Sequence, residues 1–344
     1  MKKKILFLAS LDSIHALKWI NYFSNIYDVT VISLKKPISN EQISNNIKIY
    51  VFDKSTKNLF NILDLLFSIL FKNLISSKPD ILHVHYLGFN ALIAILLKIK
   101  FKRTKYVSTI WGSDLVYNKK NFFKRLILKF IFKFSTIITT DAQFIKKELI
   151  KEFMVKKDKI KHINFVIDIN FFKKKNYNNY LAKKYSLNEN EYVILSLRAH
   201  KKIYDITTLL KAIAITKEKI KIKCLIYGNG PLTEKLKENA KDLNIDNHII
   251  FLGRYDQKIL PDIFSIIDLY VSTSLSDAGI SSSTAEAMAC KIPCAISDNS
   301  DNNKWITNKF NGFIFPNSDY LELSKIFLEL PKINRDLMDT GLER

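Results

Sequence analysis

Short runs of apolar residues alternate with longer stretches of helical periodicity along almost the whole chain of 344 residues. In the first half, the runs predict strands at residues 5–9, 29–34, 47–52, 81–84, 106–110 and 136–140. The intervening stretches predict helices at residues 15–23, 59–76, 90–98 and 122–134. This alternation is typical of βαβ units, in which helices cover both faces of a parallel sheet.

The polar segment at residues 171–190 lacks strand periodicity, and we interpret it as a linker. The alternation then resumes, with strands expected at 193–197, 223–227, 249–252, 269–272 and 294–297, and helices at 207–216, 232–243 and 283–290. The sequence therefore predicts two doubly wound α/β domains, residues 1–170 and 191–344. Ligands of such domains bind beyond the carboxyl ends of the strands, and a cleft between two of them is a natural site.

Composition excludes several other classes of protein. Apolar types make up 47% of the chain, with 24 Phe and 15 Tyr, so a large core is expected and disorder is not. The three cysteines (Cys224, Cys290 and Cys294) form no CxxC pair, which argues against a disulfide scaffold or zinc ribbon and favours a reducing, cytoplasmic compartment. The basic start has too short an apolar stretch for a signal peptide, and we expect no transmembrane helix.

The formal net charge of +21 is unevenly distributed. Residues 1–200 hold 35 Lys and Arg against 14 Asp and Glu, whereas residues 201–344 hold 19 of each. A genome rich in A and T would raise the lysine content evenly along the chain. The excess in the first part instead indicates an anionic partner: a membrane surface, a phosphorylated substrate or nucleic acid.

Residues 274–298 (SLSDAGISSSTAEAMACKIPCAISD) form the most specific segment. A loop with Gly279 follows a predicted strand and leads into a helix, so backbone N–H groups and a helix N-terminus converge, as suits a phosphate. Glu286 lies one turn into the helix, within reach of a sugar hydroxyl. Three residues add hydroxyl groups: Ser281, Ser282 and Ser283. The alternative is an ordinary serine-capped helix with a solvated glutamate.

This segment resembles the donor-site motif of the family 4 glycosyltransferases of the GT-B fold. The matching residues are Glu286-Ala287-Met288-Ala289 and Pro293. Four further segments resemble the family in order and spacing: Val193–Arg198 with the helix after it, Gly228-Asn229-Gly230-Pro231, Phe251-Leu252-Gly253-Arg254, and Asn311-Gly312-Phe313. The resemblance covers nearly the whole chain, and it implies two Rossmann-like domains facing a central cleft.

The resemblance also implies retaining transfer from a nucleotide-diphosphate sugar, with no metal and no tightly bound cofactor. Arg198 matches the family's phosphate-binding arginine, and Glu286 the glutamate that holds the ribose. The family's lysine and the glycine after it fall on Ile203 and Tyr204. We therefore expect Lys201 or Lys202 to take the role of that lysine, and we include Lys202 among the donor-binding residues. The family's first glutamate falls on Ala278, so we assign Asp277 to the sugar hydroxyls. The other expected donor-binding residues are Gly228, Gly230, Arg254, Gly279, Ile280, Ser281 and Ser282.

The N-terminal domain is expected to hold the acceptor. Trp111 stands where many relatives have a histidine that faces the reacting sugar, and a tryptophan cannot act as a base. Asp114 either binds an acceptor hydroxyl or closes an Asx turn with Gly112. His85 and its neighbour His83 suit capping or acceptor contacts better than a metal pair, because no third ligand is evident. His15 either reaches the cleft or simply lies on the first turn of its helix.

Residues 122–134 (FFKRLILKFIFKF) interleave basic and large apolar side chains. This pattern fits a helix lying in a membrane interface, or equally a core helix with a solvated basic face. No nucleic-acid motif accompanies the charge. We therefore expect a cytoplasmic enzyme, peripheral on the inner face of the cell membrane, with a lipid-linked or saccharide acceptor in lipopolysaccharide or capsule synthesis.

Three alternatives remain open at the level of sequence. A nucleotide-sugar epimerase of the same fold would need no acceptor. A phosphorylase would bind glucose phosphate, but no segment resembles the lysine site of its cofactor. A non-catalytic relative would bind nucleotide sugar without turnover, which the altered lysine position and Trp111 keep open. The chain ends at Arg344, about where the family's closing helix begins, and we expect that helix to be missing.

Overall fold

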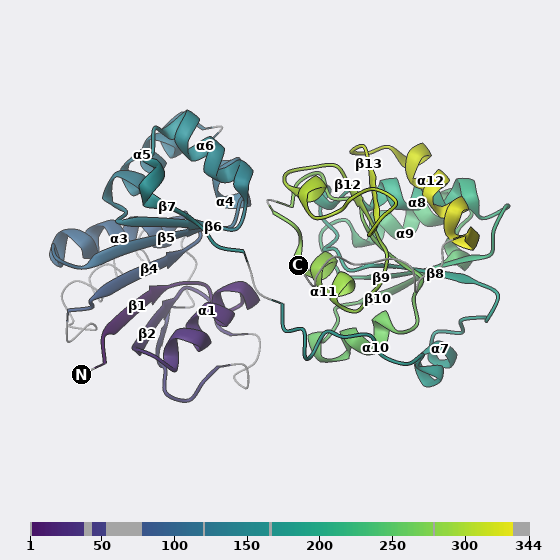
Figure 1. The fold of residues 1–344 in the computed structure, drawn as a ribbon, viewed down its shortest axis with the longest axis horizontal. Helices are drawn as coiled ribbons and strands as arrows, with labels where there is room; N and C mark the ends of the chain where they lie inside the picture. Colours follow the sequence, from purple (N-terminus) through teal and green to yellow (C-terminus); the bar gives the residue numbers. More distant parts are fainter. Residues whose placement is uncertain are drawn as a thin grey trace. The chain divides into compact units, whose positions relative to one another are not determined.

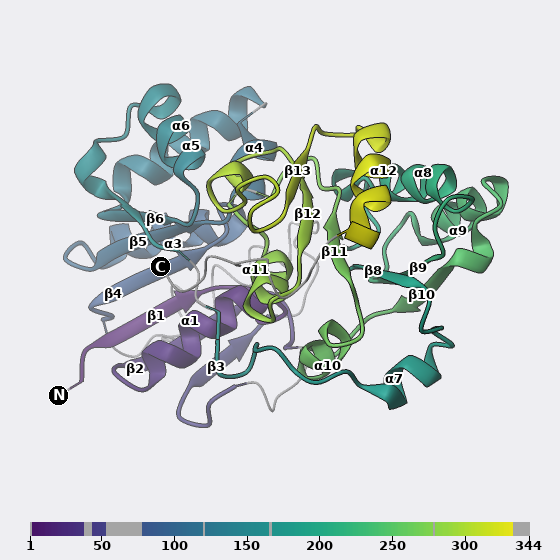
Figure 2. The same cartoon turned by 45° about the vertical axis from the view of Figure 1, so that its right-hand side comes forward.

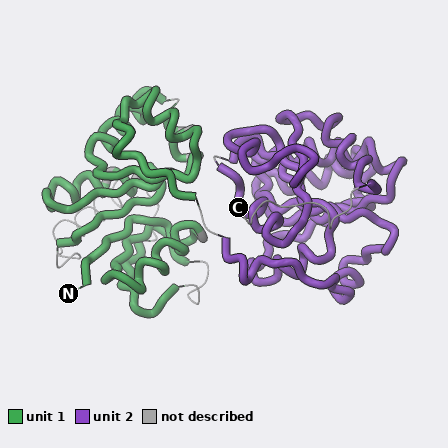
Figure 3. Tube along the Cα trace, viewed as in Figure 1, with its two compact units in different colours: residues 1–164 green, residues 165–344 purple. Residues whose placement is uncertain are grey.

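The computed structural model describes residues 2–37, 43–52, 78–119, 121–164, 167–277 and 279–332. The chain divides into two compact units, residues 1–164 and 165–344 (Figure 3). The helix expected at residues 59–76 lies outside the described residues, as do Ala278 and residues 333–344, so the expectation that the closing helix is missing stays a prediction.

The described part of the first unit contains a seven-stranded parallel sheet (Figure 1). Its strand order is β3-β2-β1-β4-β5-β6-β7, so the direction of winding reverses between β1 and β4. The strands are β1 (Lys4–Leu8), β2 (Asp28–Ser33), β3 (Lys48–Val51), β4 (Ile81–His85), β5 (Lys105–Ile110), β6 (Ile137–Thr140) and β7 (Ile160–His162). The described helices are α1 (Ile14–Ser24), α3 (Phe89–Lys100), α4 (Ser113–Asn118), α5 (Phe122–Phe134) and α6 (Gln143–Phe153).

The second unit contains a six-stranded parallel sheet in the order β10-β9-β8-β11-β12-β13, with its reversal between β8 and β11. The strands are β8 (Tyr192–Ser196), β9 (Ile222–Tyr227), β10 (Ile249–Gly253), β11 (Leu269–Ser272), β12 (Cys294–Ser297) and β13 (Phe313–Phe315). Its described helices are α7 (Asn179–Lys184), α8 (Ile206–Thr216), α9 (Thr233–Asp242), α10 (Leu260–Phe264), α11 (Ser282–Ala289) and α12 (Tyr320–Glu329).

Both faces of the second sheet are buried, because its strands send apolar side chains to each side. In β8, Val193 and Leu195 enter one core and Ile194 enters the other. Helices α8, α9 and α12 contribute to the core of Ile194, whereas α7, α10 and α11 contribute to the opposite core. Figures 1 and 2 show α12 beside α8. Strands that are buried on both faces appear in a sequence as continuous apolar runs. The prediction of two doubly wound α/β domains is confirmed.

The segment at residues 171–190, expected to be a linker, packs instead on the second unit. Phe172, Ala182 and Tyr185 are buried in the core that faces α10 and α11. Helix α7 lies within this segment, with Asn178 as its N-cap. Helix α7 has only 6 residues. Its few apolar side chains therefore do not produce a periodicity that can be distinguished from the polar residues around them.

All three cysteines are free thiols buried in the second unit. Burial disfavours the thiolate and raises the pKa of Cys290 to about 12. Within the described residues, no helix is long and apolar enough to span a bilayer.

Candidate functional site

The point where the second sheet reverses its winding brings together polar residues from two distant segments. Arg198 follows β8, and Asp277 follows β11 in the loop that leads to α11. Because β8 and β11 are paired and parallel, their carboxyl ends lie at the same edge of the sheet. Ligands of open α/β sheets bind at such a reversal.

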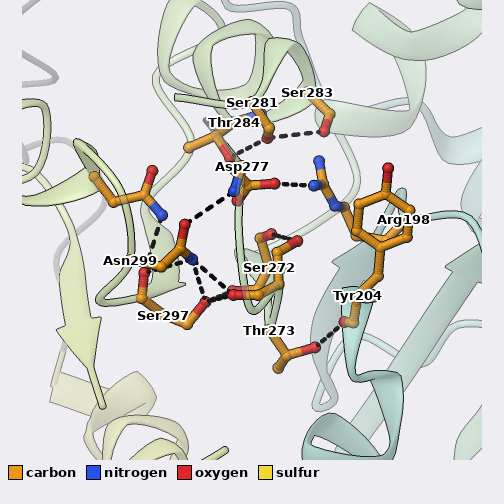
Figure 4. A network of polar contacts seen from close by, with 12 residues as sticks. Arg198, Tyr204, Ser272, Thr273, Asp277, Ser281, Ser283, Thr284, Ser297 and Asn299 are labelled. Atoms are coloured by element: carbon orange, nitrogen blue, oxygen red, sulfur yellow. Dashed lines mark hydrogen bonds and ion pairs between the residues drawn. The ribbon is translucent and has the colours of Figure 1, made fainter. Parts of the chain in front are cut away.

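Arg198 and Asp277 form a buried ion pair, in which Nη2 of the arginine contacts Oδ1 of the carboxylate (Figure 4). The two side chains are only 10% and 2% exposed. The ring of Tyr204 lies against the guanidinium, with 4.4 Å between Cζ and the ring centroid, so a cation–π contact adds to the ion pair. Burial is the largest influence on the pKa of Arg198 and lowers it, but Asp277 and the neighbouring tyrosines together hold that pKa above its ordinary value.

The loop that carries Asp277 is anchored independently of the ion pair. The backbone N–H of Asp277 donates to Oδ1 of Asn299 at 3.0 Å, and Nδ2 of Asn299 donates to the carbonyl of Ser274 at 2.6 Å. The turn that carries Tyr204 is anchored to the same loop, because Thr273 donates its hydroxyl to the Tyr204 carbonyl at 3.0 Å. The backbone thus presents Asp277 and Tyr204 to Arg198 from two sides.

The hydroxyls expected to meet a phosphate are used differently from one another. Ser281 is the N-cap of α11 and accepts the N–H of Thr284 at 3.2 Å, so its hydroxyl is occupied within the helix cap. Ser283 hydrogen-bonds to the hydroxyl of Tyr270 at 2.7 Å. In contrast, the buried hydroxyl of Ser282 has no hydrogen-bond partner among the described residues. Of these three serines, Ser282 therefore has the hydroxyl that best suits the phosphate hypothesis.

Glu286 is not the solvated glutamate of the alternative interpretation. It is 2% exposed, and Nε2 of Gln257 donates to its Oε1 at 2.8 Å. A carboxylate buried this deeply requires hydrogen-bond donors. The geometry suits a ligand with hydroxyl donors.

The turn after β9 approaches the loop after β8 more closely than a side chain would allow. A Cβ on Gly228 would lie 2.3 Å from the carbonyl oxygen of Arg198, and one on Gly230 would lie 2.5 Å from that of His200. Gly228 also has φ +109°, a conformation that side chains disfavour. The two glycines therefore fix the backbone around Arg198, and this close approach explains their spacing in the sequence.

The remaining predicted donor residues lie around this centre. Lys202 begins a short turn that ends at Tyr204, and its side chain is exposed. Arg254 follows β10 and is also exposed. The Ile280 side chain belongs to the apolar core, so only its backbone and that of buried Gly279 are available to a ligand.

Two residues of the centre escaped the sequence analysis. Tyr204 stands at the position of the family's glycine, and its place six residues after Arg198 is the signal in the sequence that it lies near the guanidinium. Asn299 follows β12 in a run of polar residues, and that run was the available signal. Both act through the tertiary pairing of loops, which the spacing of residues in the sequence does not define.

The winding of the first sheet reverses between β1 and β4. The side chains at this point are mainly aromatic rather than charged. His83 and His85 are buried, and their ring centroids are 4.7 Å apart. Nε2 of His83 is 2.7 Å from the hydroxyl of Thr109. Trp19 and Phe7 pack against both imidazoles. No three metal-ligating side chains converge anywhere in the described part of the chain.

Trp111 joins this cluster through its indole. Nε1 of Trp111 donates to Nδ1 of His85 at 3.3 Å, which places the imidazole proton on Nε2. Burial, followed by the neighbouring histidines, lowers the pKa of His85 well below its ordinary value, so the ring is neutral. The ring of His15 lies 4.9 Å from that of Trp111, and burial and then Lys18 lower its pKa to about 4. The indole N–H of Trp111 is thus used within the cluster, and the rings of His15 and His85 pack against the indole.

The carboxylate of Asp114 ties two strand ends together. Its Oδ2 accepts the N–H of Leu87, which follows β4, at 3.0 Å. Its Oδ1 accepts the N–H of Trp111, which follows β5, at 3.2 Å, and that of Leu115 at 3.1 Å. Burial raises the pKa of Asp114 to about 6, although the three N–H groups act in the opposite direction. The contact with an acceptor hydroxyl stays a prediction.

Helix α5 combines features of both interpretations of its sequence. Leu128, Ile131 and Phe132 are buried, as in a core helix. Three lysines of this helix are exposed: Lys124, Lys129 and Lys133. Five other apolar side chains are exposed as well: Phe122, Phe123, Leu126, Ile127 and Phe130. The exposed part of α5 is therefore both apolar and cationic.

Family comparisons agree with this architecture. The Glycosyl transferase 4-like family matches residues 4–142, and the family Glycosyl transferases group 1 matches residues 179–340. HepE of Anabaena, solved with UDP and glucose, superposes with a TM-score of 0.82 at 16% identity, over 99% of this chain and 93% of that chain. The fold is that of the GT-B glycosyltransferases. The two matches lie in the two units of the chain, and the chain belongs to the family 4 glycosyltransferases.

Curated relatives are similar over shorter stretches. The N-acetyl-alpha-D-glucosaminyl L-malate synthase of Bacillus anthracis is 26% identical over 216 residues, 62% of this chain. That stretch is 55% of the relative, so the match spans about half of its length. The UDP-Gal:alpha-D-GlcNAc-diphosphoundecaprenol alpha-1,3-galactosyltransferase of Escherichia coli is 31% identical over 96 residues, 28% of this chain and 24% of that protein.

We predict that Gly228→Ala is more destabilising than Gly253→Ala. Both glycines have positive φ, which costs an alanine about 1–2 kcal/mol, but only Gly228 has a backbone atom within 4 Å of the added Cβ. Urea unfolding should show an additional loss of at least about 1 kcal/mol for Gly228→Ala. Equal losses in the two variants would contradict the close approach.

We predict that Asp114 makes stability fall as the pH rises from about 4 to about 6. In this window the folded protein holds a proton that the unfolded chain has released, because the pKa of Asp114 is raised to about 6 in the fold. The wild type should therefore lose on the order of 3 kcal/mol relative to Asp114→Asn across the window. Urea unfolding at several pH values measures this difference, and a difference that is flat with pH would contradict it.

Proposed function

We propose that this enzyme transfers a sugar, with retention of configuration, from a nucleotide-diphosphate sugar to a lipid-linked or saccharide acceptor in surface polysaccharide assembly. The observation that carries the proposal is the buried Arg198 at the reversal of the second sheet, between Tyr204 and the loop that leads into α11. A buried guanidinium with its aromatic support is well suited to a phosphate.

The donor diphosphate binds Arg198, and the N–H groups of residues 279–282 with the N-terminus of α11 stabilise its charge. Ser282 donates its hydroxyl, which has no partner among the residues that the structure describes. Glu286 accepts the hydroxyls of the nucleotide ribose, beside Gln257. These fixed donors stabilise the charge that develops on the leaving diphosphate, while the acceptor hydroxyl attacks from the same face.

Exposed groups complete the donor site. Lys202 supplies the second cation in place of the family's lysine, and a long flexible side chain at the edge of the turn is suited to reach a phosphate. The backbone of Gly228 and Gly230 and the side chain of Arg254 contact the nucleoside. Asp277 serves the sugar hydroxyls.

The acceptor binds the first unit at the aromatic reversal. The half-buried ring of Trp111 offers an apolar face to a sugar, and His15 borders it. His85 holds the indole in place, and Asp114 fixes the loops around it. The E. coli relative, named for a diphosphoundecaprenol acceptor, supports a lipid-linked saccharide, and the Anabaena structure with UDP and glucose supports a nucleotide-sugar donor.

We also propose that α5 attaches the enzyme to the inner face of the cell membrane. Phe122 and Phe123 are 76% and 74% exposed, and Lys124 and Arg125 follow them directly. Exposed aromatic rings beside cationic side chains suit the interface of an anionic bilayer. The basic excess of the first part of the chain adds attraction at longer range.

We predict that one nucleoside diphosphate stabilises the protein selectively in a thermal-unfolding panel of UDP, GDP, ADP, CDP and TDP. A ligand at about a hundredfold its dissociation constant adds about 2.7 kcal/mol. Arg198→Ala and Glu286→Ala should abolish the shift, keep a native circular dichroism spectrum, and reduce turnover with sugars of that nucleotide by about 100-fold or more. The control Glu329→Ala removes a surface ion pair with Lys309 and should behave as the wild type.

A wild type that binds none of the five would refute the donor site. Near-normal turnover in either variant would refute the role of the residue concerned.

We predict that the protein floats with anionic liposomes, and less with neutral ones, at low salt. The double variant Phe122→Ser with Phe123→Ser should lose most of this binding, because each inserted phenylalanine contributes about 1.5–3 kcal/mol. Tyr180→Ser, which removes a 75% exposed ring from the second unit, is the matched control. Absence of wild-type flotation, or equal loss in the control, would contradict the membrane assignment.

A further inference from the structure

The cation of the proposed donor site has an anionic partner within the chain. The carboxylate of Asp277 occupies one terminal nitrogen of Arg198, and the ring of Tyr204 covers the guanidinium. Nε of Arg198 is buried and has no hydrogen-bond partner among the described residues. Asp277 and Tyr204 thus fix the position of the guanidinium without using all of its N–H groups. The N–H at Nε can still donate to an incoming anion.

Asp277 keeps its place without Arg198. Its backbone N–H is bound by Asn299, which is buried and in turn donates to Ser274 at 2.6 Å and to the hydroxyl of Ser297 at 3.1 Å. A rotation of the Asp277 side chain is therefore sufficient to break the ion pair, with no movement of the loop. A carboxylate that leaves Arg198 in this buried position requires other hydrogen-bond donors.

A nucleotide sugar offers both replacements at once. Its phosphates are anions for Arg198, and its sugar hydroxyls are donors for the carboxylate. A nucleoside diphosphate offers only the first, so it must displace Asp277 from Arg198 without compensation.

We propose that Asp277 is an exchangeable counter-ion of Arg198, which makes the site bind a nucleotide sugar in preference to the nucleoside diphosphate left after transfer. This inference rests on the proposed function, because it assigns the diphosphate to Arg198. While the sugar is present, its hydroxyls hold Asp277 away from the arginine. When the sugar has left, Asp277 competes again for the guanidinium and displaces the diphosphate, which favours product release.

The test is the affinity of the site for diphosphates that carry no sugar. Inorganic pyrophosphate and the nucleoside diphosphates UDP, GDP, ADP, CDP and TDP are titrated by calorimetry into the wild type and Asp277→Asn. The amide has nearly the shape of the carboxylate but no charge, so Asp277→Asn should bind pyrophosphate and the preferred nucleotide about tenfold more tightly. Asp262→Asn removes an equal charge from the half-exposed ion pair with Lys175 and should leave both affinities unchanged.

A residue that only holds Arg198 in position gives the opposite sign. Weaker or unchanged binding by Asp277→Asn would therefore overturn the exchange. Asp277→Ser, which also removes the competing charge, should bind more tightly as well, and it replaces the asparagine variant if that variant does not fold.

The two proposals fail in different ways. Tighter pyrophosphate binding by Asp277→Asn, in a protein that binds no nucleotide, would overturn the proposed function and leave the exchange at Arg198. If the wild type binds a nucleotide but Asp277→Asn binds diphosphates no more tightly than the wild type, the exchange is overturned and the proposed function remains.

Discussion

Burial of the parallel strands on both faces is the constraint on which the rest of the second unit depends. In β8, successive side chains enter two different cores, so the strand itself has no face for polar chemistry. Polar groups are confined to the ends of the strands, and the connections from β8 and β11 diverge where the winding reverses. The ion pair of Arg198 and Asp277 forms at this point because two separately anchored loops meet there.

The same constraint produces a different environment in the first unit. Its reversal is filled by Trp19, Trp111 and two buried histidines, whose rings contact one another. Burial without acidic partners keeps these imidazoles neutral, whereas burial beside Asp277 keeps Arg198 charged. One unit thus offers a fixed charge and the other offers uncharged ring faces, a division suited to a phosphate in one and a sugar ring in the other.

The sequence predicted well those features that depend on local apolar patterns. Strands β11 and β12 and helix α5 begin and end at the expected residues, because each apolar run is bounded by polar residues or turns. The short helix α7 was missed because its buried residues are too few to establish a period. The pairing of Arg198 with Asp277 joins residues 79 positions apart, and the use of Ser281 as a cap depends on where α11 begins. Such contacts arise from the tertiary meeting of loops, which local spacing does not encode.

The burial of all three cysteines has a practical consequence for studying motion. Each thiol is enclosed in the second unit, and burial raises its pKa, so none presents a thiolate to a reagent in solution. A cysteine introduced at an exposed position of each unit would therefore be modified selectively, in an otherwise unaltered chain. A pair of fluorophores attached at these two positions would report the distance between the two units in single molecules. The distance could be followed while the proposed donor and acceptor substrates bind and dissociate.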